Sequence, residues 1–153
     1  MMLGLAGRKL IQRFERCYLE AYPDGRGIET IGWGHTGPGV YRGLVWSQAQ
    51  ADSYFLLDTS AAQYIVNKTI HCAVNQNQFD AMVSLAFNIG GTAFGCSTLG
   101  RMVNGGDLVG AAMQFPLWDH EKLAGVERVD PGLETRREAE EALFKTPLAS
   151  PIA

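Results

Sequence analysis

Two carboxyl groups and a hydroxyl group stand close together near the N-terminus. They belong to Glu15, Asp24 and Thr30. Two carboxyls suit glycoside hydrolysis, in which one protonates the leaving oxygen and the other, ionised, acts as base or nucleophile. A carboxyl among apolar neighbours keeps its proton more firmly than one in a solvated turn, and a nearby hydroxyl could hold a water molecule. The alternative is structural, namely a surface Glu at a helix end and an Asp in a tight turn.

The elements around these residues can be predicted from the same stretch. Apolar residues recur at helical spacing within residues 4–16, which places Glu15 near the apolar face at the end of a helix. Residues 22–27 contain proline and glycines and are typical of a turn. Residues 28–36 read as short strands, so we expect a two- or three-stranded antiparallel sheet. A helix-end acid would then face a turn acid across this sheet.

The last predicted helix carries charges on its apolar face. It begins with Asp130 as the cap before a proline, and its apolar stripe consists of Leu133, Leu143 and Phe144. Arg136, Arg137 and Glu140 fall on the same stripe. A buried arginine needs a carboxylate partner, because an unpaired buried charge is costly. Glu15 is one candidate partner. The other interpretation is a snorkelling arginine paired locally with Glu140.

Capping residues predict most of the remaining helices. The expected caps are Ser47 for a helix over about 48–67, Asn75 with Gln78 as a capping box, Ser97 for 97–104 and Asp107 for 107–115. The apolar pattern after Gln78 is the strongest in the chain and predicts the central helix of a helical lobe. We expect residues 122–128 to form an exposed loop.

Composition excludes several classes of protein. Hydrophobic residues make up 46% and charged residues 19%, as in ordinary globular domains, and the net charge of −3 argues against a general nucleic-acid binder. Cys17, Cys72 and Cys96 form no CxxC pair, so we expect free, mostly buried thiols, with no disulfide framework and no metal site. No cofactor is indicated. Neither a secretory signal nor a membrane-spanning stretch is evident, which predicts synthesis in the cytoplasm without standard export.

Several motifs together resemble a known family. They are Phe14-Glu15, Ala21-Tyr22-Pro23-Asp24, Thr30-Ile31-Gly32-Trp33-Gly34-His35-Thr36, Phe87-Asn88-Ile89-Gly90, Ser97-Thr98-Leu99 and the stretch from Gly132 to Glu140. Their order and spacing resemble the phage-type lysozymes, glycoside hydrolase family 24. The resemblance covers nearly the whole chain. It implies one lysozyme-like α+β domain over 1–153, mainly helical. A small antiparallel sheet lobe (about 16–46) would be joined by a long helix (about 48–67) to a larger helical lobe (about 70–146) packed with the N-terminal helix.

The resemblance also implies an activity and assigns residues to it. The expected reaction is hydrolysis of the bond between N-acetylmuramic acid and N-acetylglucosamine in peptidoglycan, with Glu15 as general acid. Asp24 and Thr30 would position the attacking water or the charge that develops on the sugar. His35 and Asp58 would form an ion pair. The sugar-contacting positions would be Thr36, Phe87, Thr98 and Gln114, although Phe87 fits a core aromatic equally well.

The family comparison raises further expectations about cellular role. Many relatives carry an N-terminal membrane-targeting helix that this sequence lacks. We therefore expect a monomeric endolysin that accumulates in the host cytoplasm, does not insert stably in the membrane, and reaches the periplasm and cell wall through a separate holin-type pore. The alternatives are a catalytically silent wall-binding module of the same fold and a glycosidase acting on chitin. Arg16 departs from the family, in which glycine is common after the acid, and adds a cation beside Glu15.

Overall fold

Three short antiparallel strands form the sheet expected from residues 18–36. They are β1 (Tyr18–Pro23), β2 (Glu29–Gly32) and β3 (His35–Thr36), in the order β1-β2-β3. Thr30 on the central strand lies opposite Tyr22 on one side and Thr36 on the other. The prediction of a small antiparallel sheet is therefore confirmed.

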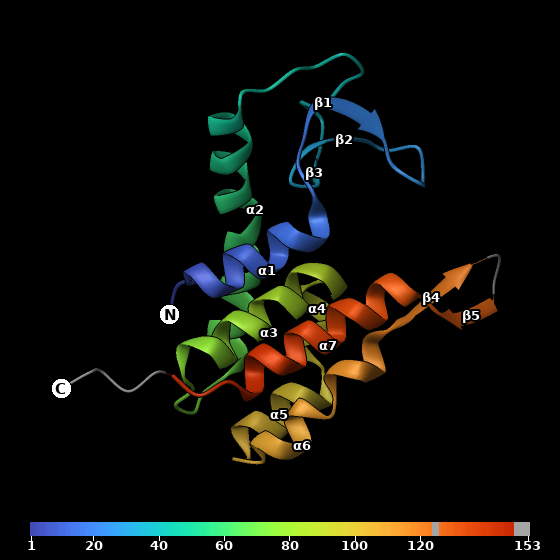
Figure 1. The fold of residues 1–153 in the computed structure, drawn as a ribbon. Helices are drawn as coiled ribbons and strands as arrows, with labels where there is room; N and C mark the ends of the chain where they lie inside the picture. Colours follow the sequence, from blue (N-terminus) through green and yellow to red (C-terminus); the bar gives the residue numbers. More distant parts are fainter. Residues whose placement is uncertain (124–125, 149–153) are drawn as a thin grey trace. The chain divides into compact units, whose positions relative to one another are not determined.

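The computed structural model describes residues 1–123 and 126–148, which fold mainly into helices (Figure 1). They divide into two units. The sheet unit comprises residues 11–61, and the helical unit comprises residues 1–10 with the described residues from 62 onward. The chain passes from one unit to the other within helix α1 (Leu5–Glu15) and within helix α2 (Gln48–Thr69).

The sheet unit has a small core of its own. Ile31 of β2, Trp46 and Ala51 are buried together, and partly buried apolar side chains pack around them. Helix α2 starts beside this core, where the Ser47 hydroxyl accepts the Gln50 amide at 3.2 Å, as its predicted capping role requires. Trp33 Nε1 donates to Asp52 Oδ1 of α2 at 2.8 Å. The β2–β3 turn is thus anchored to the first half of α2.

Helix α3 (Gln76–Ile89) supplies much of the core of the helical unit. Its residues 79–86 are all buried, and Asn75 and Gln78 form the predicted capping box. The predicted caps Ser97, Asp107 and Asp130 also accept first-turn amides. The other helices of this unit are α4 (Gly91–Gly95), α5 (Thr98–Asn104), α6 (Leu108–Ala112), the 3₁₀ helix η1 (Phe115–Trp118) and α7 (Pro131–Lys145).

The first turn of α1 is satisfied by a side chain distant in sequence. Asp80 of α3 is fully buried, and its two carboxylate oxygens accept the amides of Gly4 and Gly7 at 2.8 and 2.9 Å. A carboxylate at a helix N-terminus stabilises amides that lack partners within the helix. No local sequence signal predicts this contact, because 73 positions separate Asp80 from Gly7.

The sequence predictions for residues 122–128 and for the cysteines are wrong. The stretch expected to be an exposed loop contains a hairpin of β4 (His120–Leu123) and β5 (Val126–Val129), with residues 124–125 outside the described part. Glu121 and Arg128 lie opposite each other in this hairpin and form an ion pair at 3.0 Å. Such cross-strand pairs stabilise a hairpin, but the polar sequence of this stretch does not predict the pairing. The three cysteines are free but not buried, since Cys17 and Cys72 are half-buried and Cys96 is exposed.

Candidate active site

Glu15 is the last residue of α1, and its carboxylate lies against the β2–β3 turn. A Cβ atom on Gly34 would stand 3.1 Å from Glu15 Oε2. Gly34 has φ of +89°, in the left-handed region that favours glycine. The glycine therefore serves two purposes, because it permits the turn and leaves room for the carboxylate of the acid.

Arg16 occupies a backbone conformation that favours glycine. Its φ is +55°, and its amide donates to Gln12 O at 3.2 Å, which ends α1 in a left-handed cap. A non-glycine residue in this conformation costs roughly 1–2 kcal/mol. The Arg16 residue is exposed. The helix end immediately after the acid is thus strained.

Asp24 is held by backbone amides in the turn between β1 and β2. Its Oδ1 accepts the amides of Arg26 and Ile28 at 2.8 and 2.9 Å, and Oδ2 pairs with the Arg26 guanidinium at 3.2 Å. These bonds lower the pKa of Asp24, first through the Ile28 amide and then through Arg26. The local geometry therefore keeps this carboxylate ionised and fixed in direction.

Thr30 and Asp24 share one backbone anchor. The Ile28 carbonyl accepts both the Asp24 amide and the Thr30 hydroxyl, each at 2.9 Å. Thr30 is buried, and since its proton is committed to Ile28 O, its oxygen has lone pairs left to accept a hydrogen bond. The Ile28 carbonyl thus anchors the backbone of Asp24 and the hydroxyl of Thr30 together.

His35 lies beside Asp58 of α2, as the resemblance implies. His35 Nδ1 is 2.9 Å from Asp58 Oδ2. The imidazole ring also contacts Tyr54 and Trp46, with ring centroids 4.7 and 5.3 Å away. These contacts attach β3 to the first half of α2, so the pair has a structural role within the sheet unit.

The four expected sugar-contacting residues are divided between the units. Thr36 is exposed on β3, directly opposite Thr30. The other three belong to the helical unit. Phe87 is half-buried near the end of α3, the Thr98 hydroxyl accepts Arg101 Nη2 at 2.8 Å, and Gln114 precedes η1. Their contact with sugars stays a prediction.

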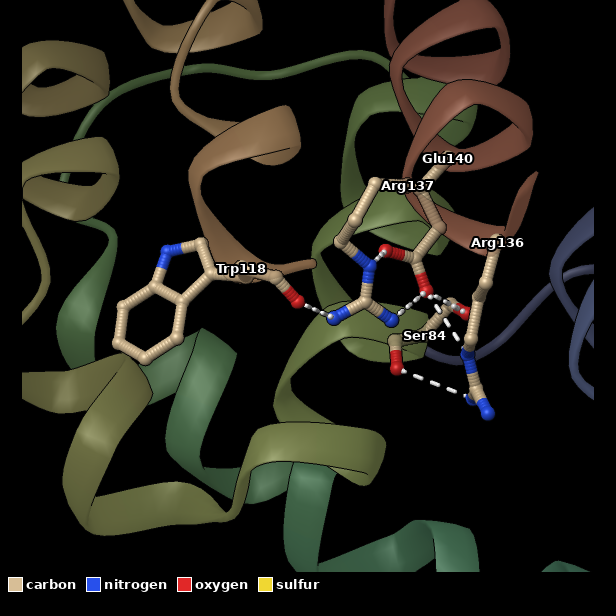
Figure 2. A network of polar contacts seen from close by, with 5 residues as sticks. All are labelled: Ser84, Trp118, Arg136, Arg137 and Glu140. Carbon is tan, nitrogen blue, oxygen red and sulfur yellow. Dashed lines mark hydrogen bonds and ion pairs between the residues drawn. The ribbon is translucent and has the colours of Figure 1, made fainter. Parts of the chain in front are cut away.

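Arg136 and Arg137 both contact Glu140 in the interior of the helical unit (Figure 2). Glu140 Oε1 accepts Arg136 Nε at 3.2 Å, Arg137 Nη2 at 3.1 Å and the Ser84 hydroxyl at 2.6 Å. The snorkelling interpretation is wrong, since Arg136 is 4% and Arg137 0% exposed. The local partner is present, but inside the core. A pairing of Glu15 with either arginine stays a prediction.

The buried charges of this network are ordered by further contacts. Arg137 Nε lies 2.8 Å from Glu140 Oε2 as an ion pair without hydrogen-bond alignment, and Arg137 Nη1 donates to Trp118 O at 3.4 Å. Burial raises the pKa of Glu140 and lowers that of Arg137, because both charged forms lose hydration, and the mutual ion pair opposes both shifts. The network joins α7 to α3 and η1.

Two residues important for this geometry were not predicted as site residues. Gly34 sets the room for Glu15, and Tyr22 lies opposite Thr30 on β1. Gly34 could have been suspected, because two glycines two positions apart within a strand pattern indicate backbone that approaches something closely. Tyr22 had no local signal, because strand register depends on pairing across the turn.

We expect the Asp24 carboxyl to titrate below its ordinary range when followed by NMR. The Ile28 amide is the largest cause, so Arg26→Ala should raise the midpoint only part of the way. A lowered folded pKa means that Asp24 stabilises the fold above its unfolded pKa, and that this contribution is lost as pH falls through the folded pKa. A midpoint at or above the ordinary value would contradict the hydrogen bonds described.

Gly34→Ala should reduce activity strongly, while its effect on stability should match that of a comparable glycine substitution away from Glu15. The new Cβ would stand 3.1 Å from Glu15 Oε2, so the carboxylate must shift by a few tenths of an ångström. Rates are sensitive to such shifts, since a misplacement of about 1 Å can cost roughly 10²-fold. The matched control is Gly43→Ala, which has nearly the same φ, +86°, but no atom within 4 Å of the new Cβ. The melting temperatures of the two variants should fall by similar amounts. Equal activities of the two variants would show that the position of the Glu15 carboxylate does not depend on the room left by Gly34.

Comparison with known proteins points to one family. The phage lysozyme family model matches residues 12–140. The endolysin of Acyrthosiphon pisum secondary endosymbiont phage 1 is 40% identical over 146 residues, which are 95% of this chain and 99% of that protein. The endolysin structure from Escherichia coli O157:H7 phage FAHEc1 aligns with a TM-score of 0.91 at 37% identity, covering 95% of this chain and 94% of that one.

A second structure gives the same result. The muramidase domain of SpmX from Asticaccaulis excentricus aligns with a TM-score of 0.88 at 36% identity, covering 95% of this chain and 98% of that one. The mainly helical α+β fold and these relatives define a lysozyme-type hydrolase. The chain belongs to the phage lysozyme family. Within residues 1–123 and 126–148, none of the helices has the length and apolar character needed to span a membrane.

Proposed function

We propose that the protein is a phage endolysin that hydrolyses the β-1,4 bond between N-acetylmuramic acid and N-acetylglucosamine in peptidoglycan. The observation that carries this proposal is the arrangement of the sheet unit. It holds the Glu15 carboxylate against Gly34, and the backbone of Ile28 fixes both other residues, because its amide donates to the Asp24 carboxylate and its carbonyl accepts the Thr30 hydroxyl. The endolysin and muramidase relatives support the same activity.

In the proposed mechanism the two carboxyls have different roles. Glu15 donates a proton to the glycosidic oxygen as the bond to the anomeric carbon breaks. Asp24, kept ionised by its amide contacts, accepts a proton from the attacking water, and the Thr30 oxygen helps to orient that water. A water molecule attacking from the opposite face would invert the anomeric carbon.

The cellular role is proposed from the family. The enzyme acts as a monomer, accumulates in the host cytoplasm and passes through a separate holin-type pore to reach peptidoglycan. Lysis should then require co-expression of a pore-forming protein, and light scattering after size exclusion should give the monomer mass. Lysis by the enzyme expressed alone would contradict release through a separate pore, and a dimer mass would contradict the monomer.

The reaction is tested by identifying the products. Purified peptidoglycan and chitin are incubated with the protein, released reducing ends are quantified, and products are analysed by mass spectrometry and by NMR of the anomeric proton. We expect N-acetylmuramic acid at the new reducing ends, in the inverted configuration, and little release from chitin. Reducing ends of N-acetylglucosamine, or faster release from chitin, would overturn the proposed bond. Wall binding without any release would favour the silent module.

A further inference from the structure

A row of three side chains crosses the sheet at the site. The register pairs Tyr22 of β1 with Thr30 of β2, and Thr30 with Thr36 of β3. Residues directly opposite in antiparallel strands project from the same face of the sheet. Tyr22, Thr30 and Thr36 therefore share one face, whereas Ile31 and His35, the next pair along, share the opposite face with the small core.

Only the two ends of this row are accessible. Thr30 is 4% exposed, and its hydroxyl proton is donated to Ile28 O. Thr36 is exposed and Tyr22 is partly exposed. A ligand lying on this face would meet Tyr22 and Thr36 on either side of a recessed Thr30. Tyr22 is thus as well placed to contact a ligand as Thr36, which the family resemblance assigns to sugar binding.

The environment of Tyr22 combines an aromatic surface with two acids. Its ring lies 4.6 Å from the ring of Tyr18, centroid to centroid, which restricts its orientation. Burial, the neighbouring Tyr18, and then the charges of Asp24 and Glu15 raise the pKa of the Tyr22 phenol. The phenol is a hydrogen-bond donor on which the charges of both candidate catalytic carboxylates act.

We propose that Tyr22 is a substrate-binding residue, whose ring lies along a sugar next to the scissile bond and whose hydroxyl donates to a sugar oxygen. A pyranose ring has an apolar face of C–H groups and a rim of oxygens, so a phenol offers both kinds of contact. This inference rests on the proposed function. It assigns to Tyr22 ground-state binding of the glycan, and leaves proton transfer to Glu15 and Asp24.

The test separates binding from catalysis. Glu15→Gln is used as the background, and its affinity for a tetrasaccharide of alternating N-acetylglucosamine and N-acetylmuramic acid is measured by calorimetry with and without Tyr22→Phe or Tyr22→Leu. Losing one hydrogen bond should raise Kd roughly 2- to 12-fold in the Phe variant. The Leu variant should lose more, because the aromatic face is also removed. Tyr41→Phe is the control, since Tyr41 is 62% exposed in a loop of the same unit.

Kinetics of the otherwise unchanged enzyme complete the test. Tyr22→Phe should raise KM on soluble glycan strands by the same factor as Kd, with kcat within about twofold, the pattern of a ground-state contact. Unchanged Kd in both Tyr22 variants would overturn the inference, and so would a lower kcat with unchanged Kd. Absence of hydrolysis by the wild-type protein would contradict the proposed function instead, and the calorimetric comparison would still decide the role of Tyr22.

Discussion

Glu15→Gln should reduce the release of reducing ends from peptidoglycan by about 10³-fold or more, the largest effect expected of any single change in the site. General acid catalysis alone contributes on the order of 10²–10⁴-fold. The amide has the shape of the carboxyl, so it fits the room left by Gly34, but it has no proton to transfer to the leaving oxygen. The loss should therefore appear in kcat.

The control for this substitution lies in the same unit. Glu20 is exposed on β1, and Glu20→Gln makes the same change in net charge and chemistry away from Gly34. It should keep activity within about twofold, as expected for a surface substitution. If Glu15→Gln and Glu20→Gln were equally active, Glu15 would not be the acid, and the Gly34 contact would be a packing feature only.

Glu140→Gln should destabilise the protein by about 3–5 kcal/mol, because it removes the carboxylate with which the fully buried Arg137 guanidinium forms its ion pair. The structure makes this the largest stability effect expected: Glu140 and Arg137 are both 0% exposed, and Oε1 of the glutamate accepts three hydrogen bonds. A loss of this size is a large share of the 5–15 kcal/mol that typically separates folded from unfolded states. Urea unfolding measures it as a lower midpoint at an unchanged slope.

A neighbouring residue on the same helix provides the control. Glu138 is exposed on α7, two residues before Glu140, and Glu138→Gln should change stability by no more than about 0.5 kcal/mol. Similar midpoints for both variants would mean that Glu140 is not the charge that compensates Arg136 and Arg137. A change of slope in the Glu140 variant alone would instead show that the folded or the unfolded state had altered its compactness.

Local patterns were enough to predict several helices and their starts. The caps at Ser47, Asn75, Ser97, Asp107 and Asp130 each accept an amide three residues further along the chain. The capping side chain and the backbone amide that donates to it therefore lie in one short stretch of sequence. The turn at Asp24 is equally local, because its carboxylate binds amides two and four residues ahead. Such contacts can be predicted without knowledge of the tertiary structure.

Contacts between distant segments depended on the tertiary structure. The Asp80 carboxylate that satisfies the start of α1, and the Ser84 hydroxyl that binds Glu140, act across more than fifty positions. No periodicity signals which element will pack against which. The β4–β5 hairpin was missed for a related reason, since cross-strand pairs such as Glu121 with Arg128 exist only once the register is set.

The sequence alone therefore determined the candidate acids and the turn at Asp24, because Glu15, Asp24 and Thr30 lie in one short stretch and the hydrogen bonds of Asp24 and Thr30 are local. The tertiary structure decided what surrounds them. It placed Gly34 against the Glu15 carboxylate, set Tyr22 opposite Thr30, and assigned Arg136 and Arg137 to a buried Glu140. The physical reason is that chain-local hydrogen bonds depend on spacing, whereas strand register and the pairing of buried charges depend on which segments pack together.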